Sequence, residues 1–345
     1  MNIPKVSIII VTWNSQYYIC DALESIMSQT FHDFSVIIID NNSMDDTIGL
    51  VKKHFPKVYV IKNIKNFGYS KANNIGIKLS KSEYVLVMNP DIILENNFLK
   101  NLVDFADKHE EAGSFSGKLF KLEKEDHQAT ERSDGLHYAK KSTIIDSAGI
   151  IMQKNRNAIN RGEGQENSEI YNENAKVFGA PGCLALFRKK ALLDVEIFNE
   201  YFDEIFFAYK EDVDLAWRLL LYGWESWFVT DAHAYHERYF QSIGGNSILQ
   251  YIRSRKKISK KLRFLSLRNQ YLMIIKNEHL KNFLLYSPRI VLKSMQNLLL
   301  IIFVEPFLIK VFFDLPKLFI IFLRKRKIIM SRSKMTSKKI KKWFI

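Results

Sequence analysis

The chain has 345 residues, of which 47% are hydrophobic and 13% are aromatic. This composition excludes a disordered chain, and the length exceeds the size at which one hydrophobic core usually stops growing, so we expect two structural units. The two cysteines, Cys20 and Cys183, lack metal-type spacing and exclude a disulfide framework, which fits a reducing compartment.

The formal net charge of +14 is unevenly distributed along the chain. Residues 251–345 contain 24 Lys and Arg but three acidic residues, whereas residues 1–250 contain 27 Lys and Arg and 34 acidic residues. A mildly acidic body therefore carries a strongly basic tail. Basic tails bind polyanions, either nucleic acid or anionic lipid.

The first 90 residues alternate between strand-like and helix-like patterns. Apolar, β-branched runs at 6–13, 34–40, 58–63 and 83–89 predict buried strands, and the intervening segments at 15–29, before His54 and at 70–80 predict helices. This alternation is typical of βαβ units and a parallel sheet. Residues 113–187 favour more irregular β structure, helices are predicted near 188–195 and 210–221, and the chain becomes helical and basic from about 248.

Polar side chains follow each of the first four predicted strands. They are Thr12 and Asn14, then Asp40, then the stretch 63–68, and then the stretch 89–91. Ligands of parallel sheets bind outside the carboxyl ends of the strands. Turn formation explains any one of these residues equally well, because Asn and Asp favour turns. The four strand ends together favour a binding site.

Three of these features suggest particular ligands. Asp91, in the tripeptide NPD, offers oxygen ligands of the kind that Mg²⁺ and Mn²⁺ prefer, although the tripeptide is also ordinary turn chemistry. Gly68 precedes a predicted helix start, where backbone can approach phosphate oxygens, but the stretch lacks the Gly-Lys-Ser/Thr of a P-loop. His236 is a possible metal ligand, and an ordinary packed histidine is the alternative.

The stretch FFAYKEDVDLAWRLLLYGW, residues 206–224, places three carboxylates at a predicted helix start: Glu211, Asp212 and Asp214. Acidic residues in a first turn complement the helix dipole by some ~0.3–1 kcal/mol each, which explains Glu211 and Asp214 without any function. The aromatic residues before the helix favour a second interpretation. An apolar wall raises the pKa of a carboxyl group toward the range of a general base.

The segment 283–323 is very apolar but is interrupted by charges and prolines. Its longest uninterrupted apolar run, 298–304, is far shorter than the ~20 residues that a spanning helix needs. The pattern predicts amphipathic helices that lie in the membrane interface, held by RKRK at 324–327 and later lysines on the cytoplasmic face. A helical subdomain packed on the body is the alternative. Nucleic-acid binding is disfavoured, because such interfaces are polar.

Taken in order, these motifs resemble the family 2 glycosyltransferases with a GT-A fold, and among them the rhamnosyltransferase-like branch. The matching stretches are VSIIIVTWNS, IIIDNNSMDDT, NFGYSKANNIGI, YVLVMNPD, IDSAGI, RGEG, VFGAPGCLALFRKKAL, FFAYKEDVDLAWRLLLYGW and HERYFQSIGG. They extend from residue 5 to about 245. The resemblance implies a GT-A catalytic domain at 1–245, with a Rossmann-like, mostly parallel sheet flanked by helices, followed by a basic, amphipathic helical region at 246–345.

The resemblance also implies roles for individual residues. Asp212 would be the catalytic base, with Glu211 beside it orienting the acceptor, while Asp91 and His236 would hold Mg²⁺ or Mn²⁺ against the donor diphosphate. The residues implied in binding the nucleotide sugar are Thr12, Asn14, Asp40, Asn66, Gly68, Asn73 and Asn89. Asp40 would bind the N3–H of a uracil or thymine base. Asn89 stands where the family's metal motif usually has an acid, which removes one negative charge.

The implied enzyme is an inverting hexosyltransferase of cell-surface polysaccharide biosynthesis. Its donor would be dTDP-rhamnose or a UDP-sugar, and its acceptor a hydroxyl of a lipid-linked glycan, for example one on polyprenyl diphosphate. The protein would be peripheral, at the cytoplasmic face of the cell membrane. The alternative is a non-catalytic partner that binds a nucleotide sugar within a glycan-assembly complex.

Overall fold

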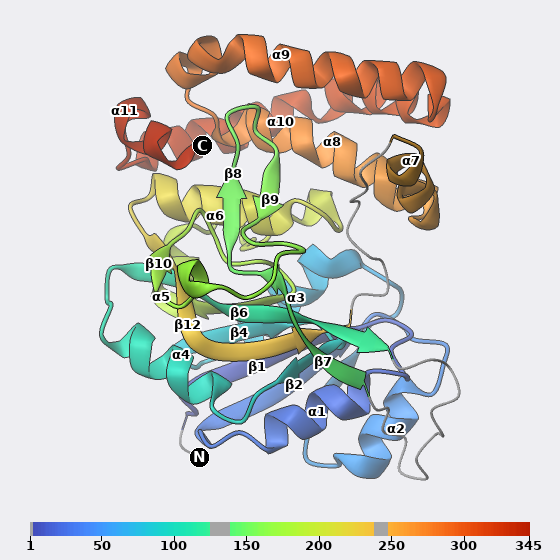
Figure 1. The fold of residues 1–345 in the computed structure, drawn as a ribbon, viewed down its shortest axis with the longest axis vertical. Helices are drawn as coiled ribbons and strands as arrows, with labels where there is room; N and C mark the ends of the chain where they lie inside the picture. Colours follow the sequence, from blue (N-terminus) through green and yellow to red (C-terminus); the bar gives the residue numbers. More distant parts are fainter. Residues whose placement is uncertain (1–2, 125–138, 238–247) are drawn as a thin grey trace.

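The computed structural model describes residues 3–124, 139–237 and 248–345, and its elements form a mixed α/β fold (Figure 1). The strands are β1 (Val6–Thr12), β2 (Phe34–Asp40), β3 (Tyr59–Lys62), β4 (Tyr84–Met88), β5 (Ile92–Leu94), β6 (Ala112–Lys124), β7 (Ala139–Ser147), β8 (Ile150–Met152), β9 (Ala158–Asn160), β10 (Ala175–Lys176), β11 (Leu184–Arg188) and β12 (Glu225–His236). The helices are α1 (Ile19–Met27), α2 (Thr47–His54), α3 (Gly68–Leu79), α4 (Phe98–Asp107), α5 (Lys189–Asp194), α6 (Glu211–Leu221), α7 (Ile248–Lys257), α8 (Lys260–Asn277), α9 (Leu280–Phe303), α10 (Lys310–Arg332) and α11 (Ser337–Ile340).

One large sheet runs through the molecule in the order β10-β12-β6-β11-β4-β1-β2-β3. The strands predicted from the first 90 residues, β1 to β4, all pair in parallel, as expected. Beyond β4 the sheet is mixed, because β11 pairs antiparallel with both β4 and β6, whereas β12 pairs parallel with β6. The expected mostly parallel sheet is therefore confirmed for the first half of the domain.

Both faces of the sheet are covered, which explains the continuous apolar runs. Along β1, Ile8 and Ile10 face a core with α1 and α4, whereas Ile9 faces a second core with α3 and α6. Side chains of a strand point alternately to the two faces, so a strand covered on both faces is apolar over most of its length. The carboxyl ends of the parallel strands therefore lie at one edge of a rigid sandwich.

The helices after residue 248 form a further layer over α6, above the sheet (Figure 1). Lys276 of α8 is buried and bonds Asp203 at 2.6 Å and Asp214 of α6 at 2.8 Å. Lys325 of α10 reaches the same Asp203 at 2.7 Å. Buried ion pairs that are fully bonded hold elements in one arrangement, because losing one partner leaves an uncompensated charge. The helical layer is thus joined to the rest of the protein by specific contacts.

The described helices include none that is both long enough and apolar enough to cross a membrane. The predicted domain boundary at 245/246, and the stretch QSIGG at the end of the last matching motif, lie outside the described residues. The division into 1–245 and 246–345 stays a prediction.

Candidate active site

The ends of β1 and β2 bring the predicted base-binding residues together. The Thr12 hydroxyl donates to Asp40 Oδ1 at 3.0 Å, and the Ser43 backbone N–H donates to Asp40 Oδ2 at 3.0 Å. The Ser43 hydroxyl also donates to Asp40 Oδ1, and the Asp40 side chain is fully buried. The turn interpretation of Asp40 therefore has direct geometric support. A carboxylate has about four acceptor positions, so three bonds leave room for one more donor.

Asn14 lies beside this pair and in an unusual backbone conformation. Its φ of 52° is in the left-handed region that asparagine tolerates better than most residues. Its side-chain oxygen accepts from the Met44 N–H at 2.9 Å, and its own N–H donates to the Ser43 hydroxyl at 2.9 Å. The loop after β2 is thus bonded to the loop after β1, and it covers Asp40.

Gly68 is the first residue of α3, not the residue before the helix as the sequence predicted. Its φ is +85°, and a Cβ there would come within 2.6 Å of Phe207 atoms, so only glycine fits. Asn66 accepts from the Gly68 N–H at 2.8 Å and shapes this turn. The buried Asn73 donates to the Tyr69 carbonyl at 3.0 Å, while its own Oδ1 has no hydrogen-bond partner in the described part of the chain.

The start of α6 holds the two adjacent carboxylates in different environments. Asp212 is partly exposed, and its Oδ2 accepts from the Gly182 N–H at 3.0 Å while its Oδ1 accepts from the Val213 N–H at 2.8 Å. Glu211 is buried, and its Oε2 has no hydrogen-bond partner among the described residues. Burial, followed by the nearby charge of Asp212, raises the pKa of Glu211 to about 8. At neutral pH Glu211 therefore holds a proton.

Asp214, the third carboxylate, has a structural role. It is fully buried and accepts from Arg218 at 3.1 Å, from Lys276 at 2.8 Å and from Asn277 at 2.7 Å. The helix dipole alone does not explain Asp214, because three charged or polar donors from α6 and α8 surround its carboxylate. Asp214 joins the helical layer to α6.

The loop that leads into α6 is strained and is held by α8. Phe207, Tyr209 and Lys210 have φ angles of 63°, 70° and 73°, which are costly for residues with side chains. Asn269 of α8 is buried and donates through Nδ2 to the carbonyls of Phe206 at 2.9 Å, Ala208 at 3.1 Å and Tyr209 at 2.9 Å. One amide thus supports the backbone that precedes Glu211 and Asp212.

A carboxylate–histidine–carboxylate row lies beside the end of β4. His236 Nε2 is 3.4 Å from Asp91 Oδ2, and its Nδ1 is 2.9 Å from Asp146 Oδ2. Burial opposes the charge on His236, but the charge of Asp91 and the hydrogen bonds to Asp146 and Asp91 raise its pKa well above the ordinary value. The structure therefore brings the two predicted metal ligands together and adds Asp146 behind them.

The residues present fit a divalent ion only in part. Asp91 Oδ1 is buried and has no hydrogen-bond partner in the described ranges, so it is free to take a cation. Metal-bound histidines usually donate their second ring N–H to a carboxylate, as His236 can to Asp146. The described residues contain no group of three or more His, Cys, Asp or Glu side chains that converge on one point. A metal held here would take its other ligands from a bound molecule or from water.

Residues 182 and 183 connect the two halves of the site. The Asn89 N–H donates to the Cys183 carbonyl at 2.8 Å, two residues before Asp91. Gly182, next to Cys183, bonds Asp212 through its N–H and accepts from the Tyr69 hydroxyl through its carbonyl. The strand end with the predicted metal motif and the start of α6 are thus joined through one short turn.

Sequence reasoning missed Asp146 and Asn269 as parts of this site. Asp146 lies in IDSAGI, one of the stretches that resemble the family. Its place in that stretch could have marked it as a site residue. Asn269 gave no signal, because a lone asparagine in an amphipathic helix is unremarkable. Its role depends on a contact with a loop about 60 residues earlier in the chain.

The sequence profile of Glycosyl transferase family 2 matches residues 7–196, which is more than half of the chain. The chain therefore belongs to glycosyl transferase family 2, and its fold is similar to the GT-A type.

Relatives with assigned roles match just under a third of the chain. The minor teichoic acid biosynthesis protein GgaB of Bacillus subtilis is 29% identical over 108 residues, which are 30% of this chain and 12% of that protein. The poly(ribitol-phosphate) β-N-acetylglucosaminyltransferase TarS of Staphylococcus aureus is 31% identical over 110 residues, which are 30% of this chain and 19% of that protein. The chain thus spans less than a fifth of the length of these two relatives.

The same fold occurs in a crystal structure of GalNAc-T7 with UDP, GalNAc and Mn²⁺. That structure superposes with a TM-score of 0.55 at 12% identity, over 79% of this chain and 51% of that chain. At this identity the likeness concerns the fold alone. It agrees with the mixed sheet and flanking helices described above.

Proposed function

We propose that the chain transfers a sugar, with inversion, from a nucleotide-diphosphate donor to a hydroxyl group of a cell-surface or lipid-linked glycan. The observation that carries the proposal is the pair of adjacent carboxylates at the start of α6, one neutral and one oriented by backbone N–H groups. A buried carboxyl group whose pKa is raised, as that of Glu211 is, is common at sites of acid–base chemistry. A polymer acceptor agrees with the names of GgaB and TarS.

Asp212 is the proposed base. In an inverting transfer the acceptor hydroxyl attacks the anomeric carbon opposite the leaving nucleotide, and a carboxylate must accept the hydroxyl proton as the bond forms. The two N–H bonds fix the plane of the Asp212 carboxylate and leave lone pairs for that proton. Glu211 keeps its own proton at neutral pH, so we assign it to a hydrogen bond that orients the acceptor.

The donor nucleotide is assigned to the ends of β1, β2 and α3. We propose that Asp40 accepts the N3–H of a uracil or thymine base, with Thr12 and Asn14 beside it. Because Asp40 is fully buried, the loop that carries Ser43 would have to move aside for the base to reach the remaining acceptor position of Asp40. The residues proposed to contact the rest of the donor are Asn66, Gly68, Asn73 and Asn89. The buried and unpartnered Oδ1 of Asn73 supports this assignment.

Asp91 and His236 are the proposed ligands of Mg²⁺ or Mn²⁺. When bound, the ion would neutralise the negative charge that grows on the departing diphosphate. Asp146 would then fix the orientation of the His236 ring from behind. With Asn89 in place of an acid, Asp91 is the one carboxylate of the NPD turn, so the donor phosphates must supply several ligands.

The donor sugar is proposed to be rhamnose from dTDP-rhamnose, as in the rhamnosyltransferase-like branch, or a hexose from a UDP-sugar. The presence of Glu211 and Asp212 at the start of α6 supports the catalytic proposal over the alternative of a non-catalytic partner.

We further propose that α9 and α10 bind the cytoplasmic face of the membrane peripherally. Large apolar side chains on α9 are exposed at spacings of three and four residues: Val291, Met295, Leu298, Leu299 and Ile302. On and beside α10 the exposed ones include Ile309, Phe312, Phe313, Phe319 and Ile320. Exposed apolar side chains in such numbers mark an interaction surface, and the surrounding positive charge favours anionic lipid.

Titration calorimetry with dTDP-rhamnose, UDP-glucose, UDP-galactose and UDP-N-acetylglucosamine, each with and without Mn²⁺, tests the proposal. We expect one donor to bind, and to bind only with the metal. Binding without metal dependence would remove Asp91 and His236 as ligands. Failure of every donor to bind would contradict the proposed function.

A further inference from the structure

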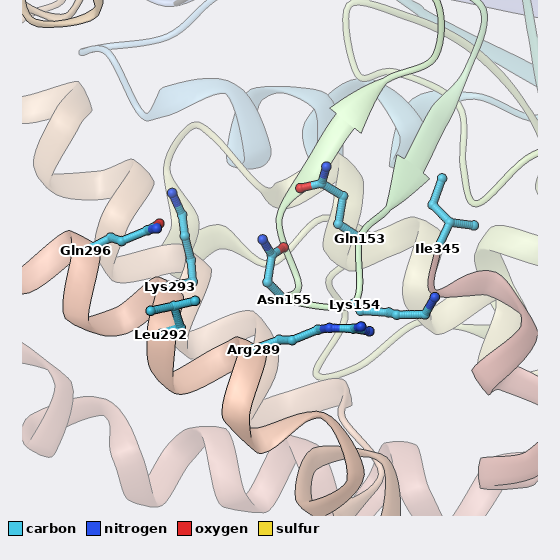
Figure 2. A pocket seen from close by; sticks show the side chains of 8 residues that line it. All are labelled: Gln153, Lys154, Asn155, Arg289, Leu292, Lys293, Gln296 and Ile345. Atoms are coloured by element: carbon cyan, nitrogen blue, oxygen red, sulfur yellow. The ribbon is translucent and has the colours of Figure 1, made fainter. Parts of the chain in front are cut away.

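A cavity of about 390 Å³ lies between the turn after β8 and one face of α9 (Figure 2). Its walls are Gln153, Lys154 and Asn155 from the turn, and Arg289, Lys293 and Gln296 from α9. The three α9 residues are separated by four and three positions, so they share one face of the helix. None of the residues assigned to the donor or to the metal lines it.

The lining of this cavity is strongly positive. Lys154, Arg289 and Lys293 contribute three cations, and no lining side chain is acidic. Among the described residues, no acidic side chain pairs with any of the three within 4.0 Å. Ile345 also lines the cavity, and even with a carboxylate counted there the cations remain in excess. Guanidinium and ammonium groups that share a hollow with amide donors match the oxygens of a phosphate.

The wall opposite α9 is preformed. Arg156, one residue beyond the turn residues, is fully buried, forms an ion pair with Glu278, and stacks 3.8 Å from the ring centre of Phe344. The Lys154 N–H donates to the Ile345 carbonyl at 2.9 Å. Binding of an anion would therefore require little further ordering of the turn residues, and a small loss of conformational entropy favours affinity.

The cavity is electrostatically connected with the start of α6. Burial lowers the pKa of Lys210, the charges of Asp212 and Glu211 oppose that lowering, and the positive charge of Lys293 adds a smaller contribution to it. Lys210 is the N-cap of α6 and immediately precedes Glu211 and Asp212. An anion in the cavity would offset the positive charge of Lys293. Lys293 thus belongs to the cavity wall and also acts on the charge of the residue that precedes Glu211.

We propose that this cavity binds a phosphate or diphosphate group of the sugar acceptor and so positions the acceptor hydroxyl at Asp212. The inference rests on the proposed function, because it assigns the acceptor class of the same site. It also accounts for α9, whose exposed apolar residues would lie against lipid while Arg289 and Lys293 hold the phosphate. A lipid headgroup offers the same chemistry, so the test must separate the two sources.

The test uses the full chain and the double variant R289Q/K293Q, with K281Q/K317Q as the matched control. Lys281 and Lys317 are exposed basic residues of α9 and α10 outside the cavity. Inorganic pyrophosphate is titrated by calorimetry in metal-free buffer, so that the donor site, which is proposed to need the metal, does not contribute to the signal. We expect binding to the wild type and the control, and at least ~10-fold weaker binding to R289Q/K293Q, which corresponds to about 1.4 kcal/mol.

Equal pyrophosphate binding by all three proteins, or none by the wild type, would overturn the proposal. A parallel arm measures co-sedimentation with phosphatidylglycerol vesicles. If R289Q/K293Q loses vesicle binding but keeps pyrophosphate binding, the cavity holds lipid headgroups and the acceptor assignment is wrong. Donor binding is measured separately on each protein. If the wild type binds no donor, the proposed function is contradicted, whatever the pyrophosphate result.

Discussion

Glu211 and Asp212 are identical in charge type and adjacent in sequence, yet they differ in environment. Glu211 is buried, whereas Asp212 is partly exposed and bonded to the backbone of Gly182. Burial disfavours the charged form of a carboxyl group, and a second carboxylate nearby adds to the effect. The crowding of acids at this helix start therefore yields one neutral and one oriented carboxyl group.

The raised pKa of Glu211 predicts a pH dependence of stability. The folded protein binds this proton up to about pH 8, whereas the unfolded chain releases it near 4.5. Between pH 4.5 and about pH 8 the folded protein binds more protons than the unfolded chain, so the free energy of unfolding falls as pH rises. We expect the Tm of the wild type to fall more steeply from pH 5 to pH 9 than the Tm of Glu211→Gln, as measured by calorimetry.

The control for this measurement is Glu24→Gln, at an exposed carboxylate on α1. It should leave the slope of the Tm against pH unchanged. Equal slopes for the wild type and Glu211→Gln would contradict a buried, protonated Glu211.

Asp146 allows a test of the metal assignment without removing a ligand. Asp146→Asn keeps the shape but weakens the hydrogen bond to His236 Nδ1. Changes behind metal ligands typically cost about 10–100-fold in metal affinity. We expect Mn²⁺-dependent donor binding to weaken by about that factor in calorimetry. If donor binding and its metal dependence stay as in the wild type, His236 is not a ligand.

At the scale of elements, α8 supports the strained loop before α6 through Asn269. Asn269→Ala removes three hydrogen bonds to the carbonyls of residues 206, 208 and 209. Because Asp212 follows this loop closely, we expect kcat to fall about 10–100-fold, as small misplacements of catalytic groups do, with donor affinity unchanged. Steady-state kinetics of transfer and donor calorimetry measure the two effects.

Asn282→Ala is the matched control, since it removes a buried amide of α9 that donates to the Ser337 carbonyl at 3.0 Å. Both variants lose stability, and only Asn269→Ala should lose kcat. Equal kcat in the two variants would mean that Asn269 does not position the loop.

The elements of the first half were predictable because their signals are local. The apolar run at 34–40 became β2 at Phe34–Asp40, and the alternation of strand and helix gave the parallel pairing of β1 to β4. The strand ends followed from topology, so Thr12 and Asp40 were expected together and lie in contact. The resemblance directed attention to Asp91 and His236, which lie 3.4 Å apart.

Features that depend on long-range contacts were not predictable. The first residue of α3 was misplaced because Gly68 is fixed by the approach of Phe207, about 140 positions away. Asp214 looked like a helix-dipole residue because its partners, Lys276 and Asn277, lie about 60 positions later. The charge of the tail was visible, but the cavity between α9 and the turn after β8 requires the packed structure.

At the scale of the whole molecule, the helices of the basic tail lie together on one side of the acidic body (Figure 1). Some basic side chains of the tail are buried in the protein. The ammonium groups of Lys276 and Lys325 bond the buried carboxylate of Asp203. Other basic residues, such as Lys281 and Lys317, are exposed on α9 and α10, the helices that also carry the exposed apolar residues. This separation predicts a membrane surface that combines apolar and electrostatic attraction.

The prediction for this surface is binding to anionic but not to neutral vesicles at ~0.15 M salt, with weaker binding at higher salt. Leu299→Glu/Ile302→Glu should abolish co-sedimentation, because it places charge on the exposed face of α9. The same changes should leave donor affinity intact. Retained vesicle binding by this variant, or equal binding to duplex DNA by the wild type, would contradict the membrane assignment.

The central claim is that Asp212 removes the acceptor proton while other residues bind the donor. Its most direct test measures transfer and donor binding for the wild type and Asp212→Asn, with the donor identified by calorimetry. We expect transfer to fall by about 10²–10⁴-fold, the usual contribution of a general base, while the donor Kd stays within the error of the wild type. Transfer at the wild-type rate, or loss of donor binding together with transfer, would contradict the assignment of Asp212 as the base.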